Sequence, residues 1–202
     1  MEAGPPYYDA QGKVLTGRSR WFSVRLTEQE APWAFVGGRP ASANSTPELL
    51  ATTLGLVLLA PPELDSPGAV GTVAVTGLTD SQVSAAVVTR GLTTSFPLCA
   101  VAMELAAQLE ERRAELFLDW IPRDMNREAD KLADGVWEGF DTKLRVHCSL
   151  GEVKWLVLPE LLAAGRDFYA QRKKVARARE KPRGAGVPGA AKRQKLRERE
   201  PW

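Results

Sequence analysis

The chain of 202 residues is poor in the side chains that form redox and zinc sites. It contains two cysteines, Cys99 and Cys148, and one histidine, His147. These numbers exclude a disulfide framework and a zinc finger. Long apolar runs are also missing, because the longest, residues 49–60, includes two threonines and is shorter than the about 20 residues that cross a bilayer. No signal peptide is visible at the amino terminus, so we expect an intracellular protein with no membrane partner.

Charged residues are present in ordinary number, 26% of the chain, but their distribution is uneven. Residues 166–202 hold 13 Lys/Arg and 4 Asp/Glu, a net charge of +9, whereas residues 1–165 carry a net charge of −7. Such a basic segment indicates a nucleic-acid partner or a targeting signal. The candidate nucleic-acid-binding residues are Lys192, Arg193, Lys195 and Arg197. Nuclear import and simple solubilising charge remain alternatives for this short run, so nuclear localisation is a second expectation.

Strand-like and helix-like patterns alternate along the chain, which predicts an α/β domain. We expect strands over residues 18–26, 71–79 and 115–121, and helices over residues 47–59, 81–90, 96–113 and from Asn126 onward. Two helices have a continuous apolar face, formed by Leu98, Ala102, Leu105 and Leu109 and by Ala129, Leu132, Ala133 and Val136. Residues 155–158 fit either a strand or the start of a helix. A basic helix follows, and we expect most of residues 180–202 to be disordered because they have little to bury.

Three carboxylates stand in distinctive local settings. Glu48 opens an apolar helix, Asp80 follows a strand, and Asp130 lies in the phrase Pro-Arg-Asp-x-Asn-x-x-Ala-Asp-x-Leu-Ala. Each also has an ordinary explanation. Glu48 fits a capping box with Ser45, Asp80 fits the N-cap of the next helix, and Asp130 suits the first turn of a helix dipole. Capping alone does not require this order of elements, so the three together indicate a shared site.

Metal chemistry gives a physical reason for such a cluster. Hydrolysis of a phosphodiester needs an activated water and a stabilised leaving oxygen, and two Mg²⁺ ions about 3.5–4 Å apart can supply both. Mg²⁺ prefers oxygen ligands and uses few protein carboxylates, because water and phosphate oxygens complete its shell. Carboxylates at a strand end and at two helix starts can converge on one edge of a sheet and hold such ions.

Residues 21–135 resemble a type 1 ribonuclease H domain, on the strength of these three carboxylates and their order. The phrases around Ala31-Pro32-Trp33, Thr79-Asp80-Ser81-Gln82 and Trp120-Ile121-Pro122-Arg123-Asp124 are similar to reverse-transcriptase-linked domains of retroelements, of the DIRS-like kind found in dinoflagellate-type genomes. The resemblance implies a mixed sheet flanked by helices, with Glu48, Asp80 and Asp130 as catalytic ligands of Mg²⁺, or of Mn²⁺ in its place. It further implies cleavage of the RNA strand of RNA–DNA hybrids, with a reverse-transcriptase domain as partner in a longer polyprotein.

Two parts of the ribonuclease H pattern are missing. The family begins with a strand that carries an aspartate, and Asp9 is the candidate for it here, although Asp9 also reads as part of a turn after the second strand. The family's histidine loop has no histidine, since Arg123 and Asp124 occupy that region. We therefore expect an N-terminally incomplete domain over residues 1–136, a helical extension over residues 137–179 and a basic tail over residues 180–202.

Two functions remain open from the sequence. The first is metal-dependent cleavage of hybrid by Glu48, Asp80 and Asp130. The second is a catalytically inactive remnant that binds nucleic acid through its basic tail. The tryptophans Trp21, Trp33 and Trp120 lie in apolar runs and are predicted to be core residues, with base stacking as the alternative.

Overall fold

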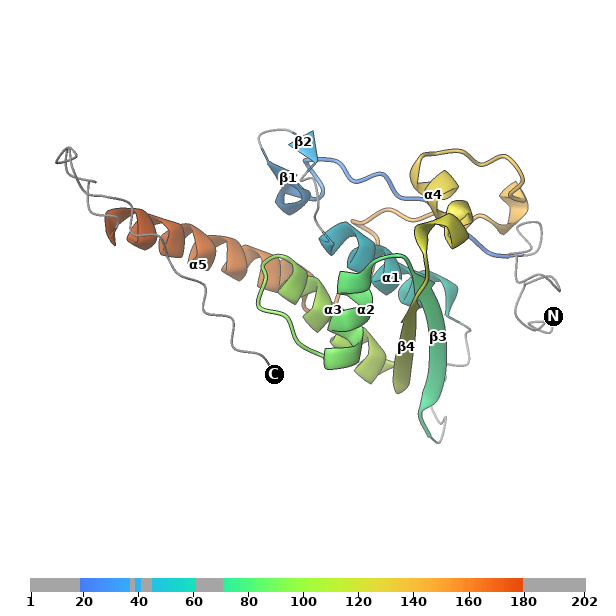
Figure 1. The fold of residues 1–202 in the computed structure, drawn as a ribbon, viewed down its shortest axis with the longest axis horizontal. Helices are drawn as coiled ribbons and strands as arrows, with labels where there is room; N and C mark the ends of the chain where they lie inside the picture. The colour runs from blue at the N-terminus through green and yellow to red at the C-terminus, as the bar shows by residue number, and fades with distance from the viewer. Residues whose placement is uncertain (1–18, 37–38, 41–44, 61–70, 180–202) are drawn as a thin grey trace, which may run out of the picture. The chain divides into compact units, whose positions relative to one another are not determined.

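The structure, a computed structural model, describes residues 19–36, 39–40, 45–60 and 71–179 (Figure 1). The chain divides into two compact units, Met1–Arg166 and Asp167–Trp202. Asp9 and the four candidate binding residues of the tail, Lys192, Arg193, Lys195 and Arg197, lie outside the described residues, as does the predicted disorder of residues 180–202. The domain bounds expected at residues 136 and 179 stay predictions. None of the described helices combines the length and apolarity that a membrane crossing requires.

The element order confirms the α/β prediction. Most of the regular structure lies in four helices and two strands of the first unit, and a fifth helix begins there and continues into the second. The elements are η1 Pro32–Ala34, β1 Phe35–Val36, β2 Arg39–Pro40, α1 Thr46–Leu59, β3 Val73–Thr79, α2 Gln82–Arg90, α3 Leu98–Glu111, β4 Ala114–Trp120, η3 Arg123–Met125, α4 Arg127–Ala133, η4 Thr142–Leu144 and α5 Leu158–Arg179. The predicted helices over residues 47–59, 81–90 and 96–113 correspond to α1, α2 and α3. Residues 155–158 lead into α5, which settles the choice left open there in favour of a helix.

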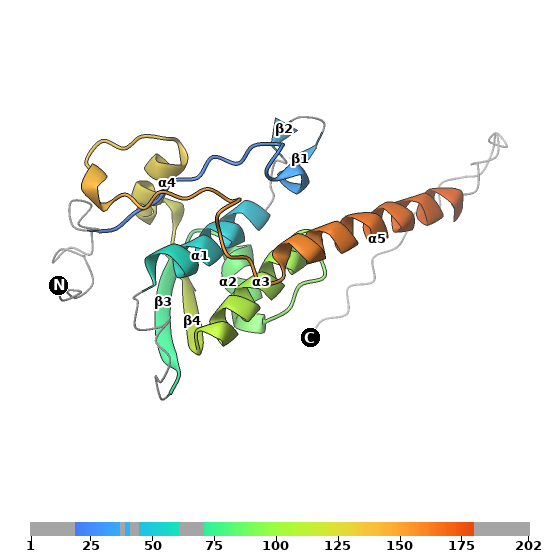
Figure 2. The ribbon, with the colours of Figure 1, turned by 180° about the vertical axis from the view of Figure 1, so that it is seen from behind.

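Strands β3 and β4 form a parallel pair, with Val73 opposite Ala114 and Thr79 opposite Trp120. Figures 1 and 2 show α2 and α3 on the β4 side of this pair, while β3 is the outer strand. Among the described residues the sheet has these two strands alone, and β1 and β2 form a separate antiparallel pair. The wider mixed sheet that the resemblance implies is therefore not seen in the described part of the chain.

The two faces of the β3–β4 pair differ in burial because side chains alternate along each strand. Val75, Leu116 and Leu118 face the helices and pack with the core. On the opposite face, Leu78 and Phe117 are 49% and 48% exposed. Parallel sheets are ordinarily covered on both faces. In this structure the described residues cover only one face of the β3–β4 pair.

The hydrophobic core lies among α1, α3 and the start of α5. Its fully or almost fully buried members include Leu49 and Leu54 of α1, Val101 and Leu105 of α3, and Leu158 of α5. The predicted apolar face of α3 is confirmed in its main features, since Leu98 and Leu105 are buried and Ala102 and Leu109 pack against the core.

Two predictions about the ends of the domain are wrong. Residues 19–26 form no strand and make one isolated bridge, from Trp21 to Arg145. The last helix, α4, has no buried residue, and Val136 beyond its end is 46% exposed. Trp21 packs against the chain after α4, and its segment pairs with neither β3 nor β4.

Gly165 of α5 gives a test of the packing between α5 and the segment before α3. A Cβ atom at Gly165 would lie 2.1 Å from the ring of Phe96, whereas a Cβ at Gly55 of α1 meets nothing within 4 Å. Alanine in a helix is favoured over glycine by about 1 kcal/mol, but overpacking costs about 1–3 kcal/mol. We expect Gly165→Ala to destabilise the protein by about 1–2 kcal/mol and the control Gly55→Ala to stabilise it slightly. Thermal melting measures both, and a gain for Gly165→Ala equal to that of Gly55→Ala would contradict the packing.

Candidate functional site

The carboxyl ends of β3 and β4 lie at one edge of the sheet, as the parallel pairing requires. The pairing continues past the strands, where the backbone N–H of Ile121 donates to the carbonyl of Thr79 at 2.8 Å. Asp80 therefore emerges beside the chain that leads from β4 to α4. Figures 1 and 2 show α4 beyond this end of the two strands.

Asp80 is held by two donors from the β4–α4 region. The side-chain amide Nδ2 of Asn126 donates to Asp80 Oδ1 at 3.0 Å, and the indole Nε1 of Trp120 donates to the Asp80 carbonyl at 3.1 Å. The N-cap of α2 is Ser81, whose hydroxyl accepts from the N–H of Ser84 at 3.1 Å. Helix capping therefore does not explain Asp80, and its Oδ2 makes no hydrogen bond within the described residues.

Asp130 belongs to the same edge through Asn126. The backbone N–H of Asp130 donates to the Asn126 carbonyl at 3.1 Å, so Asp130 stands one turn into α4. Its Oδ2 pairs with Nε of Arg123 at 3.3 Å, and the Arg123 side chain is largely exposed. The position in the first turn agrees with the helix-dipole explanation, and the arginine adds a second favourable charge.

Glu48 is placed differently from the two aspartates. It lies in the first turn of α1 with an exposed side chain, and its carboxylate makes no hydrogen bond or ion pair within the described part of the chain. The Ser45 side chain makes no capping hydrogen bond, so the predicted capping box does not form. Among the described residues, no three His, Cys, Asp or Glu side chains are close enough to share a metal ion. A joint role of Glu48 with Asp80 and Asp130 stays a prediction.

The donors at the sheet edge fit Mg²⁺ in one specific way. Mg²⁺ in proteins is commonly bound through one or two carboxylates, and its remaining ligands are water and substrate phosphates. Asp80 and Asp130 supply carboxylates of this number, with Asp80 Oδ2 unbonded and the Asp130 pair exposed to solvent. Exposed ion pairs contribute about 0–1 kcal/mol, so the Arg123 contact is a weak competitor. These residues suit a metal that arrives with phosphate, and not a cage built from protein alone.

Two contacts at the site, both with Asp80, were not predicted from the sequence. Asn126 was expected to cap α4, but its side chain makes no capping bond and holds Asp80 instead. Trp120 was expected in the core and is 46% exposed, whereas the same prediction for Trp21, 3% exposed, is confirmed. A signal for Asn126 existed in its position four residues before Asp130, where a loop residue can reach the neighbouring strand end.

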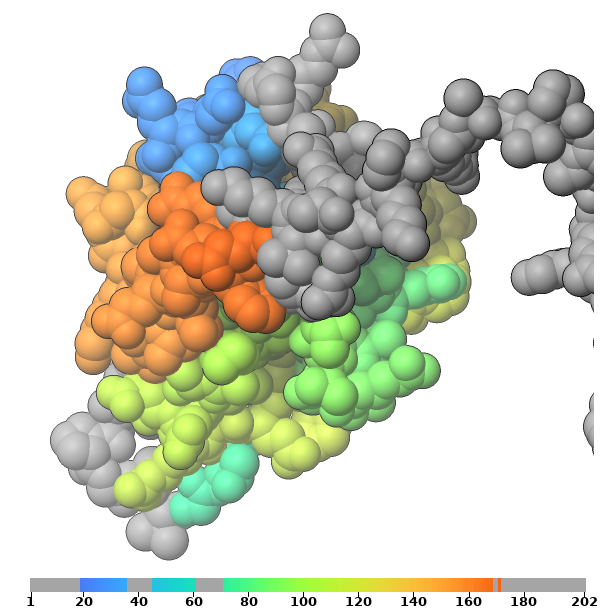
Figure 3. Space-filling model, turned by 90° about the vertical axis from the view of Figure 1, so that its left-hand side faces the viewer, coloured from blue at the N-terminus to red at the C-terminus, as the bar shows by residue number. Residues whose placement is uncertain are grey.

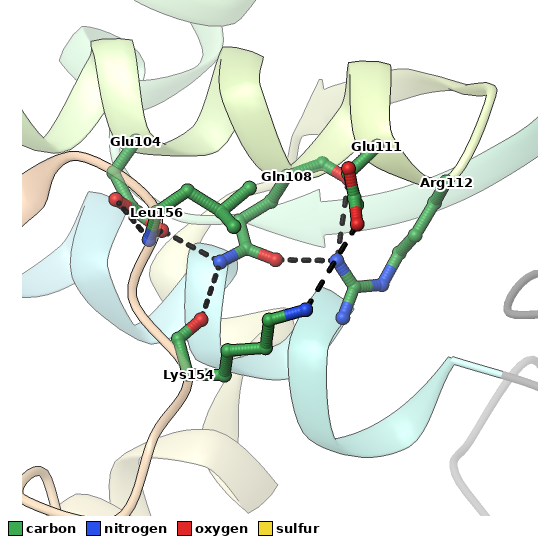
Figure 4. A network of polar contacts seen from close by, with 6 residues as sticks. All are labelled: Glu104, Gln108, Glu111, Arg112, Lys154 and Leu156. Atoms are coloured by element: carbon green, nitrogen blue, oxygen red, sulfur yellow. Dashed lines mark hydrogen bonds and ion pairs between the residues drawn. The ribbon is translucent and has the colours of Figure 1, made fainter.

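The carboxylate with the most strongly hydrogen-bonded surroundings lies away from this edge, on α3. Glu104 is completely buried and accepts from the backbone N–H groups of Leu156, Val157 and Leu158 at 2.7–3.2 Å. Gln108 Nε2 donates to Glu104 Oε1 at 2.6 Å and to the Lys154 carbonyl at 2.9 Å (Figure 4). Figure 3 shows the orange surface of the segment before α5 lying against the yellow-green surface of α3. This network binds the start of α5 to α3 and is structural, because its oxygens are already occupied.

The comparisons with known proteins add no family to this description. No protein-family model matches the chain, and neither a curated protein nor a solved structure is detectably similar to it. The α/β fold and the contacts at the sheet edge are therefore the features from which a function can be inferred.

Proposed function

We propose that this protein is a ribonuclease H-like nucleic-acid-binding protein that hydrolyses the RNA strand of RNA–DNA hybrids with Mg²⁺ at the carboxyl edge of the β3–β4 sheet. The observation that supports this most is the Asn126–Asp80 hydrogen bond of 3.0 Å. It joins the aspartate after β3 to the connection that carries Asp130, although the two residues are 50 positions apart in the sequence. Retroelement origin and a reverse-transcriptase partner belong to the proposal on the resemblance alone.

The residues at the edge have distinct roles in this proposal. Mg²⁺, or Mn²⁺, would be held by Asp80 and Asp130 and would supply an activated water and stabilise the leaving oxygen. Asn126 orients the Asp80 carboxylate, and Trp120 fixes the backbone from which it projects. Arg123 places a positive charge beside Asp130, where it can also contact a phosphate oxygen of the bound strand. Glu48 has no assigned contact in this arrangement.

A second candidate function is supported by a separate observation. The described residues bring two carboxylates to the edge and no third, and Arg123 partly neutralises one of them. A protein of this kind would bind nucleic acid without cleaving it, through the basic tail. Its affinity would then come from phosphate contacts of Lys192, Arg193, Lys195 and Arg197 and fall steeply with salt.

A cleavage assay on the full chain separates the two functions. We expect a labelled RNA–DNA hybrid to be cut in its RNA strand with Mg²⁺ or Mn²⁺ and to stay intact with EDTA, while single-stranded RNA of the same sequence serves as the control. Binding of the hybrid without cleavage, by protein shown to be folded, would leave the second function. Absence of both binding and cleavage would contradict both.

The contribution of the tail can be measured independently of cleavage. Replacing Lys192, Arg193, Lys195 and Arg197 together by glutamine is expected to lower the salt dependence of binding. If each residue contacts one phosphate, the slope of log affinity against log salt decreases in magnitude by about 3–4. The measurement is a salt titration of hybrid binding by fluorescence anisotropy. An unchanged slope would show that the phosphate contacts lie elsewhere in the chain.

A further inference from the structure

A cluster of aromatic rings encloses an arginine beyond the end of α4. This Trp–Arg cluster consists of Trp21, Trp137, Phe140 and Arg145. The ring centroid of Trp21 lies 5.9 Å from that of Trp137 and 5.5 Å from that of Phe140. The guanidinium carbon of Arg145 lies 4.0 Å from the Trp137 ring centroid and 5.3 Å from that of Trp21. The arginine is thus in cation–π contact with two indole rings.

The backbone around the cluster fixes its geometry. Trp21 donates its backbone N–H to the Leu144 carbonyl at 3.2 Å and accepts from the N–H of Val146 at 2.7 Å. Its indole Nε1 donates to the Asp141 carbonyl at 2.8 Å. These three bonds hold the chain on both sides of Arg145 against Trp21, so the position of the guanidinium is set by backbone contacts as well as by the rings.

Two properties of the cluster point to a ligand. Within the described residues the guanidinium of Arg145 has no carboxylate partner and no hydrogen-bond acceptor, and its Nε is buried without a partner. Its terminal nitrogens therefore keep their donor capacity for a molecule that supplies an oxyanion. Trp137 is 41% exposed although one face of its ring is covered by Arg145. A fixed guanidinium beside an exposed indole offers a phosphate contact and a stacking surface together.

The charges near the cluster favour a ligand that binds by stacking over one that binds by charge alone. Lys143 lies close to Arg145 in the sequence, but Glu138 follows Trp137 directly and Asp141 precedes Lys143. The local charge is therefore nearly balanced, and attraction of a polyanion by charge alone would be weak here. Stacking of a base on an aromatic ring does not depend on net charge and contributes about 1–3 kcal/mol per base.

The sheet edge that carries Asp80 and Asp130, called here the acidic edge, lies at the amino end of α4. The Trp–Arg cluster lies beyond its carboxyl end. Asn126, which holds Asp80, immediately precedes the helix, and Trp137 follows its last residue by four positions. A helix of seven residues is about 10 Å long, at about 1.5 Å per residue. One bound strand can therefore pass both ends of α4.

We propose that the Trp–Arg cluster binds an unpaired nucleotide of a strand that extends from the hybrid bound at the acidic edge. The base stacks on Trp137 and its phosphate accepts hydrogen bonds from the terminal nitrogens of Arg145. This inference rests on the proposed binding of hybrid and specifies its preferred substrate, a hybrid with a single-stranded extension. Inside a duplex both faces of every base are already stacked, so an internal base would have to unpair before it could stack on Trp137.

The test compares the affinity of the full chain for two labelled hybrids in the presence of EDTA. One hybrid is blunt, and the other has an unpaired extension of six nucleotides on one of its strands. We expect the extended hybrid to bind about tenfold more tightly, as the loss or gain of one stacked base does. Trp137→Ala should abolish this preference and leave binding of the blunt hybrid within about twofold. In the proposed complex the only part of the nucleic acid that Trp137 contacts is the unpaired base. Trp137→Phe should retain most of the preference because it keeps an aromatic ring.

Two further variants make the result specific. Phe117→Ala removes a comparably exposed aromatic ring, 48% against 41%, at a place with no arginine over it, and should leave the preference unchanged. Arg145→Lys keeps the charge but lacks the planar group that stacks and donates in a fork, and should weaken binding of the extended hybrid alone. Melting curves verify that each variant is folded.

The outcomes distinguish this inference from the function on which it rests. Equal affinity for the two hybrids, or a preference that survives in Trp137→Ala, overturns the inference while binding of the blunt hybrid still supports the proposed function. Loss of the preference in Phe117→Ala to the same extent would also overturn it. Failure of the wild-type chain to bind either hybrid, both with EDTA and with Mg²⁺, would remove both.

Discussion

Replacing Glu104 by alanine is expected to lower the free energy of unfolding by about 3–5 kcal/mol. The carboxylate accepts hydrogen bonds from three consecutive backbone N–H groups that precede and begin α5, and from the side chain of Gln108. Alanine leaves these donors without their acceptor in a region closed by the core, and each unsatisfied buried group costs about 1–3 kcal/mol. For a protein of this size the melting temperature should fall by about 6–20 °C.

The pH dependence of stability tests whether the negative charge of Glu104 is the source of its contribution to the free energy of unfolding. Burial by itself raises the pKa of this carboxyl, but the N–H groups of Leu156, Val157 and Leu158 and the Gln108 amide outweigh burial, so the pKa lies below its ordinary value. A group with a lowered folded-state pKa contributes stability above the pKa of the unfolded chain, about 4.3 for glutamate. This contribution is lost as the pH falls through the folded-state pKa.

Four proteins, the wild type and three variants, test this assignment by thermal melting at neutral pH and near pH 3. Glu104→Gln keeps the shape, but its amide turns a donor toward the backbone N–H groups, so we expect it to be destabilised at neutral pH and to lose less stability on acidification than the wild type. Glu111→Ala, on the same helix, removes an exposed ion pair of 3.9 Å with Lys154 and should change stability by less than about 1 kcal/mol. A Glu104→Ala protein as stable as Glu111→Ala would show that the network does not hold α5.

The elements of this fold were largely predictable, because their signals are local. The apolar positions of α1 and α3 recur at helical spacing, Gly91 ends α2 with a φ of 64°, and the apolar run of β4 ends just before Pro122. Periodicity and chain punctuation determine such segments without reference to the rest of the molecule.

The contacts between elements were not predictable from the same signals. In the sequence, Glu104 is a charged residue that interrupts the apolar face of α3. Its partners could not be identified there, because they are backbone groups more than 50 positions away. Trp21 lies in a pattern typical of a strand, yet it is buried against residues 137–145. In both cases one polar or aromatic side chain organises a loop whose own sequence carries no periodic signal.

The acidic edge was predictable in part for the same reason. Asp80 and Asp130 were identified from their places at a strand end and in a first helical turn, and the parallel register of β3 and β4 brings these places together. The link between them, Asn126, was assigned to its own helix instead. Glu48 was grouped with the aspartates by order along the chain, and order does not determine distance in space.

Asp80→Asn is expected to abolish hybrid cleavage, with a loss of at least about hundredfold, while the protein stays as stable as the wild type within about 1 kcal/mol. The asparagine carbonyl can still accept the Asn126 amide at the position of Oδ1, and the Trp120 bond to the backbone carbonyl of residue 80 is unaffected. What the substitution removes is the negative charge and the unbonded second oxygen, which are the properties a Mg²⁺ ligand needs.

A matched control for Asp80→Asn is Asp119→Asn, which removes an exposed carboxylate from β4, opposite Leu78 in the register, and should leave cleavage unchanged. A second readout is independent of turnover. The ligand in this readout is Mn²⁺ together with a DNA duplex of the same sequence, which has no RNA strand to cleave. It should raise the melting temperature of the wild type and not that of Asp80→Asn, because a ligand stabilises the state that binds it. If Asp80→Asn cleaves hybrid within about threefold of the wild type and keeps the Mn²⁺ effect, Asp80 is not a metal ligand. The Asn126–Asp80 bond would then serve only to join the strand end to α4.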